Sequence, residues 1–266
     1  MKYVFDHDFH IHSQISSCSR DPEQNNERIL KYAEDEGLHT IVLADHFWDE
    51  TVPGASKWYS TQDYPHICQA KPLPQSDKVK FLFGCETEMD KDMTVGCSRE
   101  RMEELDFIVI PTTHFHMERF TIAEEHLATP QTRAQGWVDK LDALLSMDLP
   151  FHKIGIAHPV CPLIWKGDRA KYLQTLDSIS EVDMHRIFAK AARLGVGIEI
   201  NMSYPDEERD TVLRPFRIAK GEGCKFYLGS DAHHPSGLDN ARKKFERAID
   251  DLGLTEEDKF ILNAKC

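Results

Sequence analysis

The chain has 266 residues, and its 45 acidic against 32 basic side chains give a net charge of −13. This charge argues against a nucleic-acid backbone as the main partner, because such an interface needs clustered lysine and arginine. The length fits one α/β domain with a sizeable buried core. Small anionic substrates remain compatible with this charge if metal ions supply positive charge locally.

No apolar run approaches the roughly 20 residues of a membrane span, and the N-terminus lacks the basic and apolar regions of a signal peptide. We therefore expect a cytoplasmic protein without a membrane partner. The seven cysteines include no C-x-x-C pair, which fits neither a disulfide framework nor a zinc ribbon. The sequence leaves the oligomeric state open.

Seven segments read as β-strands, and most of them end on a histidine or a carboxylate. In chain order they close at residues 8–12, 42–46, 82–86, 110–114, 155–158, 197–201 and 228–233. Helices are predicted between some of them, beginning near Asp21 and Pro22, from Ser180 to Gly195, and from about Leu238 to Gly253. Strand followed by helix, repeated, predicts a parallel sheet with right-handed crossovers.

Two connections are too long for simple turns, at about 47–78 and 115–135. The first holds Trp48, Trp58 and Tyr59 among several prolines, so we interpret it as an ordered loop excursion over one end of the sheet. Either excursion is placed to enclose a substrate. No composition shift marks a domain boundary, and we expect a single domain over residues 1–266.

The histidines and carboxylates at the strand ends predict a metal site. His10 and His12 are two positions apart, so on a strand both side chains point to the same side. Alone, this pair fits a core or surface feature better than a metal site. In a barrel of parallel strands, however, all carboxyl ends open on one face, and residues more than 200 positions apart converge there.

The ordered set of motifs resembles the polymerase and histidinol phosphatase (PHP) family of metal-dependent phosphoesterases, over essentially the whole chain. The matching motifs are D-x-H-x-H at 8–12, A-D-H at 44–46, G-x-E at 84–86, a histidine at 114, A-H-P at 157–159, E-I-N at 199–201 and S-D-A-H at 230–233. The resemblance implies a distorted seven-stranded, TIM-like (β/α) barrel with two or three metal ions, one carboxylate bridging two of them.

The resemblance also implies three ligand sets: His10, His12, Glu86 and Asp231 for the first ion, Glu86, His114 and His158 for the second, and His46 and His233 for the third. Relatives often carry a further ligand six residues after the second histidine of H-x-H, where this chain has Cys18. A thiolate there would favour Zn²⁺. Cys18 is therefore either a third-ion ligand or a structural cysteine.

Imidazoles with carboxylates suit Zn²⁺, Mn²⁺ or Fe²⁺ better than Mg²⁺ or Ca²⁺. Two such ions lower the pKa of a bound water and clamp the oxygens of a phosphoryl transfer. We therefore interpret Glu86, Asp231 and His233 as catalytic; the sequence does not choose between Asp231 and His233 for proton transfer. Asp8, Asp45 and the polar end of the sixth strand, Glu199 and Asn201, are expected to orient the ligands through hydrogen bonds.

Phosphate needs cations beyond the metal ions, and Arg169, Arg209 and Arg214 follow predicted strands on the expected functional face. The favoured function is hydrolysis of a small phosphomonoester, similar to histidinol-phosphate phosphatase. Phosphodiester hydrolysis of nucleotides or short oligonucleotides is the main alternative. A barrel amidohydrolase and a metal-binding regulator without turnover are minor alternatives.

Overall fold

The computed structural model describes residues 1–262, which contain nine strands in two parallel sheets. The smaller sheet has the order β1-β2-β4 and the larger one β3-β5-β6-β7-β8-β9. The strands are β1 (His7–Ile11), β2 (Thr40–Leu43), β3 (His46–Phe47), β4 (Lys80–Phe83), β5 (Cys85–Thr87), β6 (Ile108–Pro111), β7 (Ile154–Ala157), β8 (Gly197–Ile200) and β9 (Lys225–Leu228).

The count differs from the predicted seven because two predicted strands are each interrupted. β2 and β3 are separated by residues 44–45, and β4 and β5 by Gly84. The amide of Gly84 donates to Leu43 O at 2.8 Å, but the next amide, of Cys85, donates to Phe107 O at 3.2 Å. The backbone thus changes its partner strand at Gly84, and a Cβ added there would lie 2.3 Å from Phe107 O.

The seam between β1 and β9 also differs from a regular barrel. The two chain segments meet through an isolated bridge between Ile11 and Ala232, just beyond β9, rather than through a continuous ladder. Within residues 1–262 the hydrogen bonding therefore does not close one seven-stranded barrel. The strands nevertheless follow one another in space in chain order, so their carboxyl ends lie on the same face.

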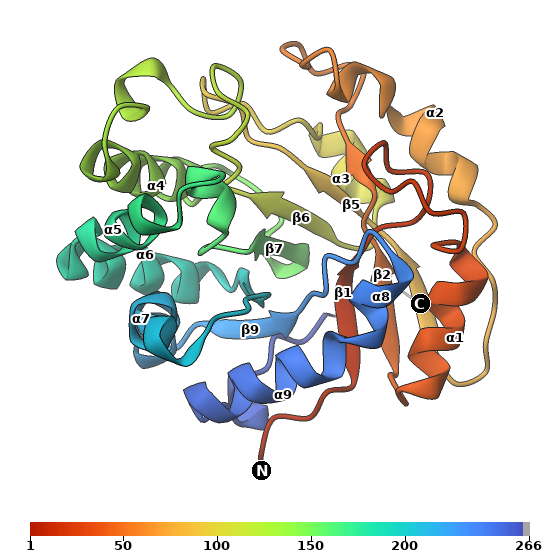
Figure 1. The fold of residues 1–266 in the computed structure, drawn as a ribbon. Helices are drawn as coiled ribbons and strands as arrows, with labels where there is room; N and C mark the ends of the chain where they lie inside the picture. Colours follow the sequence, from red (N-terminus) through yellow and green to blue (C-terminus); the bar gives the residue numbers. More distant parts are fainter. Residues whose placement is uncertain (263–266) are drawn as a thin grey trace.

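Helices pack around the strands, as Figure 1 shows. No helix in residues 1–262 is long and apolar enough to cross a membrane. The helices are α1 (Asn26–Asp35), α2 (Tyr64–Ile67), α3 (Arg99–Glu104), α4 (Pro130–Leu144), α5 (Arg169–Ser178), α6 (Glu181–Leu194), α7 (Arg209–Gly221), α8 (Pro235–Asp239) and α9 (Ala241–Leu252).

The predicted ends of α6 are confirmed. The side chain of Ser180 accepts a hydrogen bond from the Asp183 amide, and Gly195 ends the helix in the left-handed conformation with φ 72°. The predicted start of the first helix at Asp21 is wrong, because α1 is capped by Asn25 and Asp21 forms a local turn with the Glu23 amide.

Aromatic side chains fill the space enclosed by the strands. Phe9 lies 5.5 Å from Phe107 and 6.1 Å from Tyr227 between ring centroids, although these residues belong to segments that are not all neighbours in a sheet. Gly155 on β7 makes room for them, since a Cβ there would lie 2.4 Å from the hydroxyl of Tyr227. Phe9, Phe107 and Tyr227 thus form a buried cluster between the strands.

Candidate metal centre

Four predicted ligands converge at the carboxyl ends of the strands: His10 on β1, His12 directly after it, Glu86 on β5, and Asp231 after β9. Asp231 has φ 54°, in the left-handed region that costs a non-glycine residue roughly 1–2 kcal/mol. Its amide donates to His10 O at 2.7 Å, which fixes this conformation beside β1. His10, His12 and Glu86 are fully buried.

The four side chains present one ligand atom each to a common point. His10 Nε2 lies 3.0 Å from His12 Nε2 and 3.6 Å from both Glu86 Oε2 and Asp231 Oδ1. His12 Nε2 lies 3.4 Å from Glu86 Oε2 and 3.2 Å from Asp231 Oδ1. Ligands about 2.1 Å from a tetrahedral ion lie about 3.4 Å apart, so these spacings fit one ion. Glu86 Oε2 also lies 2.9 Å from His46 Nδ1, so this buried oxygen faces imidazoles of more than one possible ligand group.

Buried acceptors behind the two imidazoles set their orientation. His10 Nδ1 donates to Glu199 Oε1 at 2.6 Å, and His12 Nδ1 donates to Ser16 Oγ at 3.0 Å. Ser16 in turn donates to Asp45 Oδ1 at 2.7 Å. With Nδ1 protonated on both rings, each Nε2 keeps its lone pair for a metal ion. Asp45 therefore acts on His12 through Ser16 rather than directly.

A second group of possible ligands combines His114, His158 and Cys161, whose ligand atoms lie within 4.8 Å of one another. His158 Nε2 also lies 3.2 Å from Glu86 Oε1, the carboxylate oxygen that faces away from the first group. Glu86 thus has one oxygen toward each group, as a bridging carboxylate requires. His114 Nδ1 is hydrogen-bonded to the buried Glu88, which also accepts from the Tyr59 hydroxyl at 3.2 Å.

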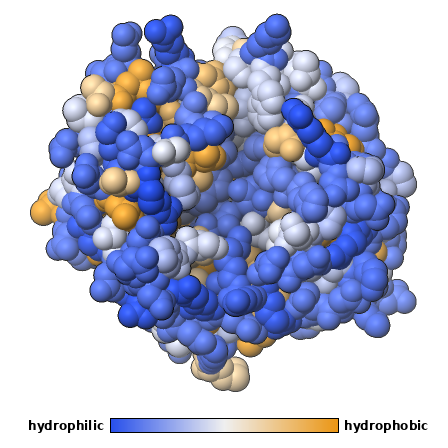
Figure 2. Space-filling model, in the orientation of Figure 1, coloured by the Kyte–Doolittle hydropathy of each residue, from blue (hydrophilic) through white to orange (hydrophobic). Residues whose placement is uncertain are grey.

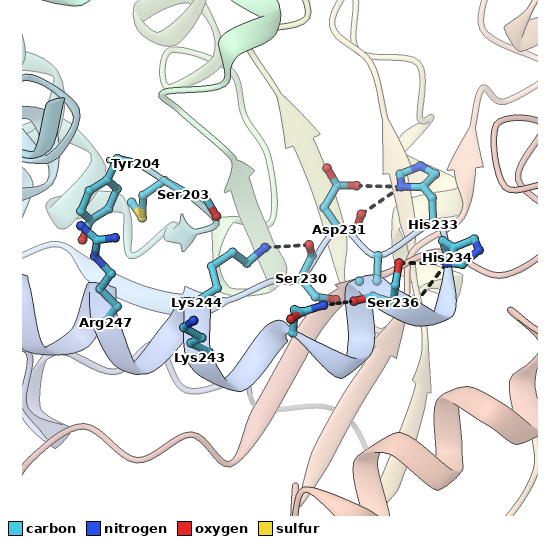
Figure 3. A pocket seen from close by; sticks show the side chains of 14 residues that line it. Ser203, Tyr204, Ser230, Asp231, His233, His234, Ser236, Lys243, Lys244 and Arg247 are labelled. Atoms are coloured by element: carbon cyan, nitrogen blue, oxygen red, sulfur yellow. Dashed lines mark hydrogen bonds and ion pairs between the residues drawn. The ribbon is translucent and has the colours of Figure 1, made fainter. Parts of the chain in front are cut away.

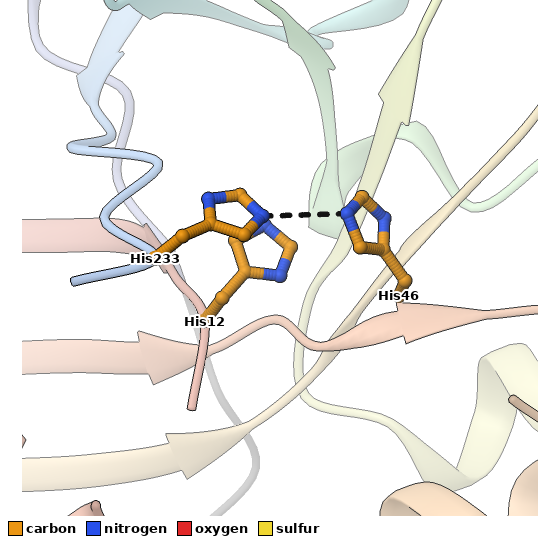
Figure 4. A group of neighbouring side chains, drawn as sticks. All are labelled: His12, His46 and His233. Carbon is orange, nitrogen blue, oxygen red and sulfur yellow. Dashed lines mark hydrogen bonds between the residues drawn. The ribbon is translucent and has the colours of Figure 1, made fainter. Parts of the chain in front are cut away.

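The third group consists of His12, His46 and His233, shown in Figure 4. His46 Nε2 and His233 Nε2 face each other at 3.4 Å, and the rings of His12 and His233 stack with centroids 3.9 Å apart. Cys18 lines the adjacent cavity but belongs to none of the three possible ligand groups in the described chain. The thiol that joins such a group is Cys161.

The charges of the cluster depend on one another. Burial opposes ionisation of Glu86, but nearby His46 and His10 hold the pKa of Glu86 well below its usual range. Burial likewise opposes protonation of His10, but Glu199 and Glu86 raise the pKa of His10 well above its usual value. Burial lowers the pKa of His233 to about 3, and the neighbouring His12 adds to this. Without a metal ion, the carboxylates of the cluster favour protonated imidazoles. A bound divalent cation would neutralise these carboxylates in place of the protons.

The cluster opens into a cavity of about 450 Å³ on the hollowed, largely hydrophilic face seen in Figure 2. The cavity is lined by possible ligands such as His46, His114 and Asp231. It is also lined by apolar or amphipathic residues from the loops after β3, β6 and β7: Trp58, Tyr59, His116, Met117 and Leu163. The cavity size and lining suit a small organic molecule attached to a polar reacting group.

Comparison with known proteins found no matching family model and no matching curated protein. Among solved structures, the chain matches the crystal structure of histidinol phosphate phosphatase from Lactococcus lactis subsp. lactis complexed with zinc, L-histidinol and phosphate. The match has a TM-score of 0.63 and 17% sequence identity, and it covers 91% of this chain and 93% of that one. The fold of this chain is similar to that of a histidinol phosphate phosphatase.

The similarity to the phosphatase extends over nearly the whole chain, so the fold is a mixed α/β fold with parallel sheets of that kind. The phosphatase was crystallised with zinc, and the His, Glu and Asp groups of this chain are suited to binding metal ions.

Two residues expected to orient ligands contact other groups instead. Asp8 Oδ1 accepts from the amides of Ser230 at 2.9 Å and His10 at 3.3 Å, and thus ties β1 to the segment after β9. Burial raises the pKa of Asp8 to about 6. Asn201 Oδ1 accepts from Lys244 Nζ at 2.7 Å. Neither side chain has a hydrogen bond to an imidazole in the described chain.

The structure does not bring the three predicted phosphate-binding arginines to the metal cluster. Arg169 is hydrogen-bonded to Glu208, and Arg209 lies 3.6 Å from Asp251. Arg214 donates to main-chain oxygens at the end of α5, including Ile179 O at 3.1 Å. Each guanidinium is therefore engaged in packing between helices, and none lines the 450 Å³ cavity.

Sequence reasoning passed over three residues that the structure places against the cluster. Glu88 lies two positions after Glu86 and so shares its side of the strand, which was a usable signal. Cys161 lies three positions after His158 in a turn, a spacing that also occurs in metal sites. Ser16 had no signal of its own, because its role depends on the path of the loop after β1.

Proposed function

We propose that this chain is a metal-dependent phosphoesterase that hydrolyses a small-molecule phosphomonoester, in the manner of histidinol-phosphate phosphatase. The observation that carries the proposal is the convergence of two imidazole nitrogens and two carboxylate oxygens at spacings of 3.0 to 3.6 Å. The similarity of fold to a phosphatase supports the same class of reaction. The cavity beside the cluster suits a small substrate.

In this proposal the first ion is held by His10, His12, Glu86 and Asp231. The second is held by Glu86, His114 and His158, with Cys161 close enough to contribute a thiolate. A third ion would take His46 and His233 with a further ligand, because the one free nitrogen of His12 serves the first ion. Zn²⁺, Mn²⁺ and Fe²⁺ all suit these donors. When bound, such ions supply a water of lowered pKa and positive charge beside the phosphate oxygens.

The chain itself contributes orientation and enclosure. Glu199 and the pair Ser16 and Asp45 hold the imidazoles of the first group with Nε2 facing the cluster. Trp58 lies edge-on to His46, with centroids 5.0 Å apart, and covers one side of the cavity. The ring is 38% exposed, so it shields this side of the site from water in part, and such shielding strengthens the electrostatic interactions there.

The experiment is metal analysis of the purified protein together with hydrolysis assays on sugar, amino-alcohol and nucleotide phosphates and on dinucleotides. We expect at least two equivalents of metal and a higher kcat/KM for a monoester than for any diester. The variant Glu86→Gln should lose at least one equivalent and reduce kcat by about 100-fold or more, because Glu86 faces two ligand groups. The exposed Glu246→Gln serves as the matched control.

Three outcomes contradict the proposal. A higher kcat/KM for a dinucleotide than for every monoester would identify a phosphodiesterase instead. Bound metal without turnover of any ester would favour a metal-binding regulator. Full activity in Glu86→Gln would exclude a reaction that depends on a carboxylate shared by two ions.

A further inference from the structure

A second cavity, of about 490 Å³, adjoins the metal centre and is lined in part by Asp231 and His233. Asp231 and His233 line both cavities and therefore form the partition between them. Figure 3 shows that the floor of the second cavity is α9, with Lys243, Lys244 and Arg247 along it.

The cations of this cavity differ in how far they are already neutralised. Arg247 is paired with Asp206 at 2.6 Å and lies 3.7 Å from Asp251. Lys244 Nζ donates to two neutral oxygens, Asn201 Oδ1 at 2.7 Å and Ser230 O at 2.9 Å. Neither it nor Lys243 has an ion pair within residues 1–262, and Lys243 has no hydrogen bond there either. Two positive charges on this wall are thus available to a ligand.

The local charge is opposite to that of the whole chain. The protein carries a net charge of −13, yet the side of this cavity away from Asp231 is lined by lysines and by hydroxyl groups such as that of Ser203. Asp231 itself faces His10 and His12, at 3.6 and 3.2 Å, so its charge is engaged on the other side of the partition. An anionic group in the cavity would meet the ammonium group of Lys243, which has no ion pair within residues 1–262, and that of Lys244, whose charge Asp231, Asp8 and Glu199 offset in part.

We propose that this cavity is a subsite for a second anionic group of the substrate, a phosphate or a carboxylate, held by Lys243 and Lys244 while the scissile phosphate lies at the metal centre. The inference rests on the proposed phosphomonoesterase function and narrows its substrate class to phosphate esters that carry a second anion. Both cavities are needed for such a substrate, and the shared partition places them next to each other.

The test compares matched substrates with and without the second anion on the zinc-loaded protein. The pairs are fructose 1,6-bisphosphate with fructose 6-phosphate, and 3-phosphoglycerate with glycerol 3-phosphate. Lys243→Ala removes an exposed charge without disturbing the core. We expect a roughly tenfold loss of kcat/KM for the two-anion substrates, mostly through KM, and less than a twofold change for the others. Lys78→Ala, an exposed lysine near the amino end of β4, is the matched control.

A binding measurement keeps the subsite testable without turnover. Isothermal titration calorimetry of 3-phosphonopropionate and propylphosphonate compares two probes that differ by a carboxylate and are not hydrolysed. The carboxylate should strengthen binding to the wild type about tenfold and much less to Lys243→Ala.

The outcomes of the two measurements separate the two proposals. Equal binding of the two probes, or equal effects of Lys243→Ala on both members of each substrate pair, overturns the subsite. If no ester is hydrolysed but 3-phosphonopropionate still binds more tightly than propylphosphonate in a way that depends on Lys243, the phosphatase function is refuted and the subsite is supported. If Lys243→Ala affects only 3-phosphoglycerate, the subsite binds a carboxylate. If it affects only fructose 1,6-bisphosphate, the subsite binds a phosphate.

Discussion

Glu199 gives the sharpest test of how the buried acceptors prepare the metal centre. Its two oxygens receive two hydrogen bonds, from His10 Nδ1 and from the His158 amide, both at 2.6 Å. In Glu199→Gln only one oxygen remains. If the amide oxygen faces the His158 amide, the NH₂ group faces His10 and favours the tautomer with the proton on Nε2. That proton occupies the lone pair with which His10 would bind the ion.

The opposite orientation of the glutamine is no better, because its NH₂ group then faces the N–H of His158. Either orientation loses one charge-assisted hydrogen bond, worth about 1.5–3 kcal/mol. Loss of a group that orients a metal ligand costs about 10- to 100-fold in metal affinity. Since both hydrogen bonds are short and Glu199 is fully buried, we expect a loss near the upper limit.

The assay is competition for zinc between the protein and a chromogenic chelator at pH 7, with circular dichroism to confirm that the variant is folded. Glu246→Gln, an exposed glutamate on α9, controls for the change of charge. A zinc affinity of Glu199→Gln within twofold of the wild type would refute the reasoning, because it would mean that the orientation of His10 does not depend on this acceptor.

Two further predictions concern the thiols and the acid stability of the chain. Cys161→Ser should weaken zinc binding at least tenfold in the same competition assay, and Cys18→Ser should leave it unchanged; equal losses would contradict this assignment. Asp6→Asn should lower the free energy of unfolding by about 1–2 kcal/mol at pH 7, because hydrogen bonds from His7 and Lys259 outweigh burial and lower the pKa of Asp6 to about 2. The pKa of Asp6 is lower in the folded than in the unfolded state, so its stabilising effect is present above about pH 4 and is lost as the pH falls to 2. Urea unfolding should therefore show the full difference in unfolding free energy between wild type and Asp6→Asn above about pH 4 and little of it at pH 2. A difference that does not change with pH would exclude the ion pair as its cause.

The sequence was sufficient to predict the parallel α/β fold and the gathering of residues such as His10, Glu86, His158 and Asp231. Their convergence follows from the strand order alone, because parallel strands in a curved sheet bring their carboxyl ends together whatever the loops do. The motifs at the strand ends are local in sequence, and so they were readable without the structure. The interruption at Gly84 was not readable, since it depends on which neighbouring strand each amide meets.

The residues around the centre were less predictable because their positions depend on packing between helices and loops. Arg214 follows a strand in sequence, as a phosphate-binding residue would, but it turns to main-chain oxygens after α5. Lys244 lies on the last helix, and only the fold shows that this helix runs beneath Ser230. The spacing of charged residues along a helix does not show whether they face solvent or line a cavity.

The seam beside β1 couples metal binding to the cohesion of the fold. His10 and His12 come from the three-stranded sheet, whereas Glu86 belongs to the six-stranded sheet and Asp231 follows its last strand. An ion held by all four would join two sheets that meet there through an isolated bridge and hydrogen bonds such as that from the Ser230 amide to Asp8, rather than through a continuous ladder. Binding of the ion and closure of the seam are then thermodynamically linked. An ion that binds only the closed seam stabilises it, and a seam that opens more easily binds the ion more weakly. Free metal at 100 times its dissociation constant adds about 2.7 kcal/mol to the closed state. The concentration of available metal thus sets how firmly the molecule is closed.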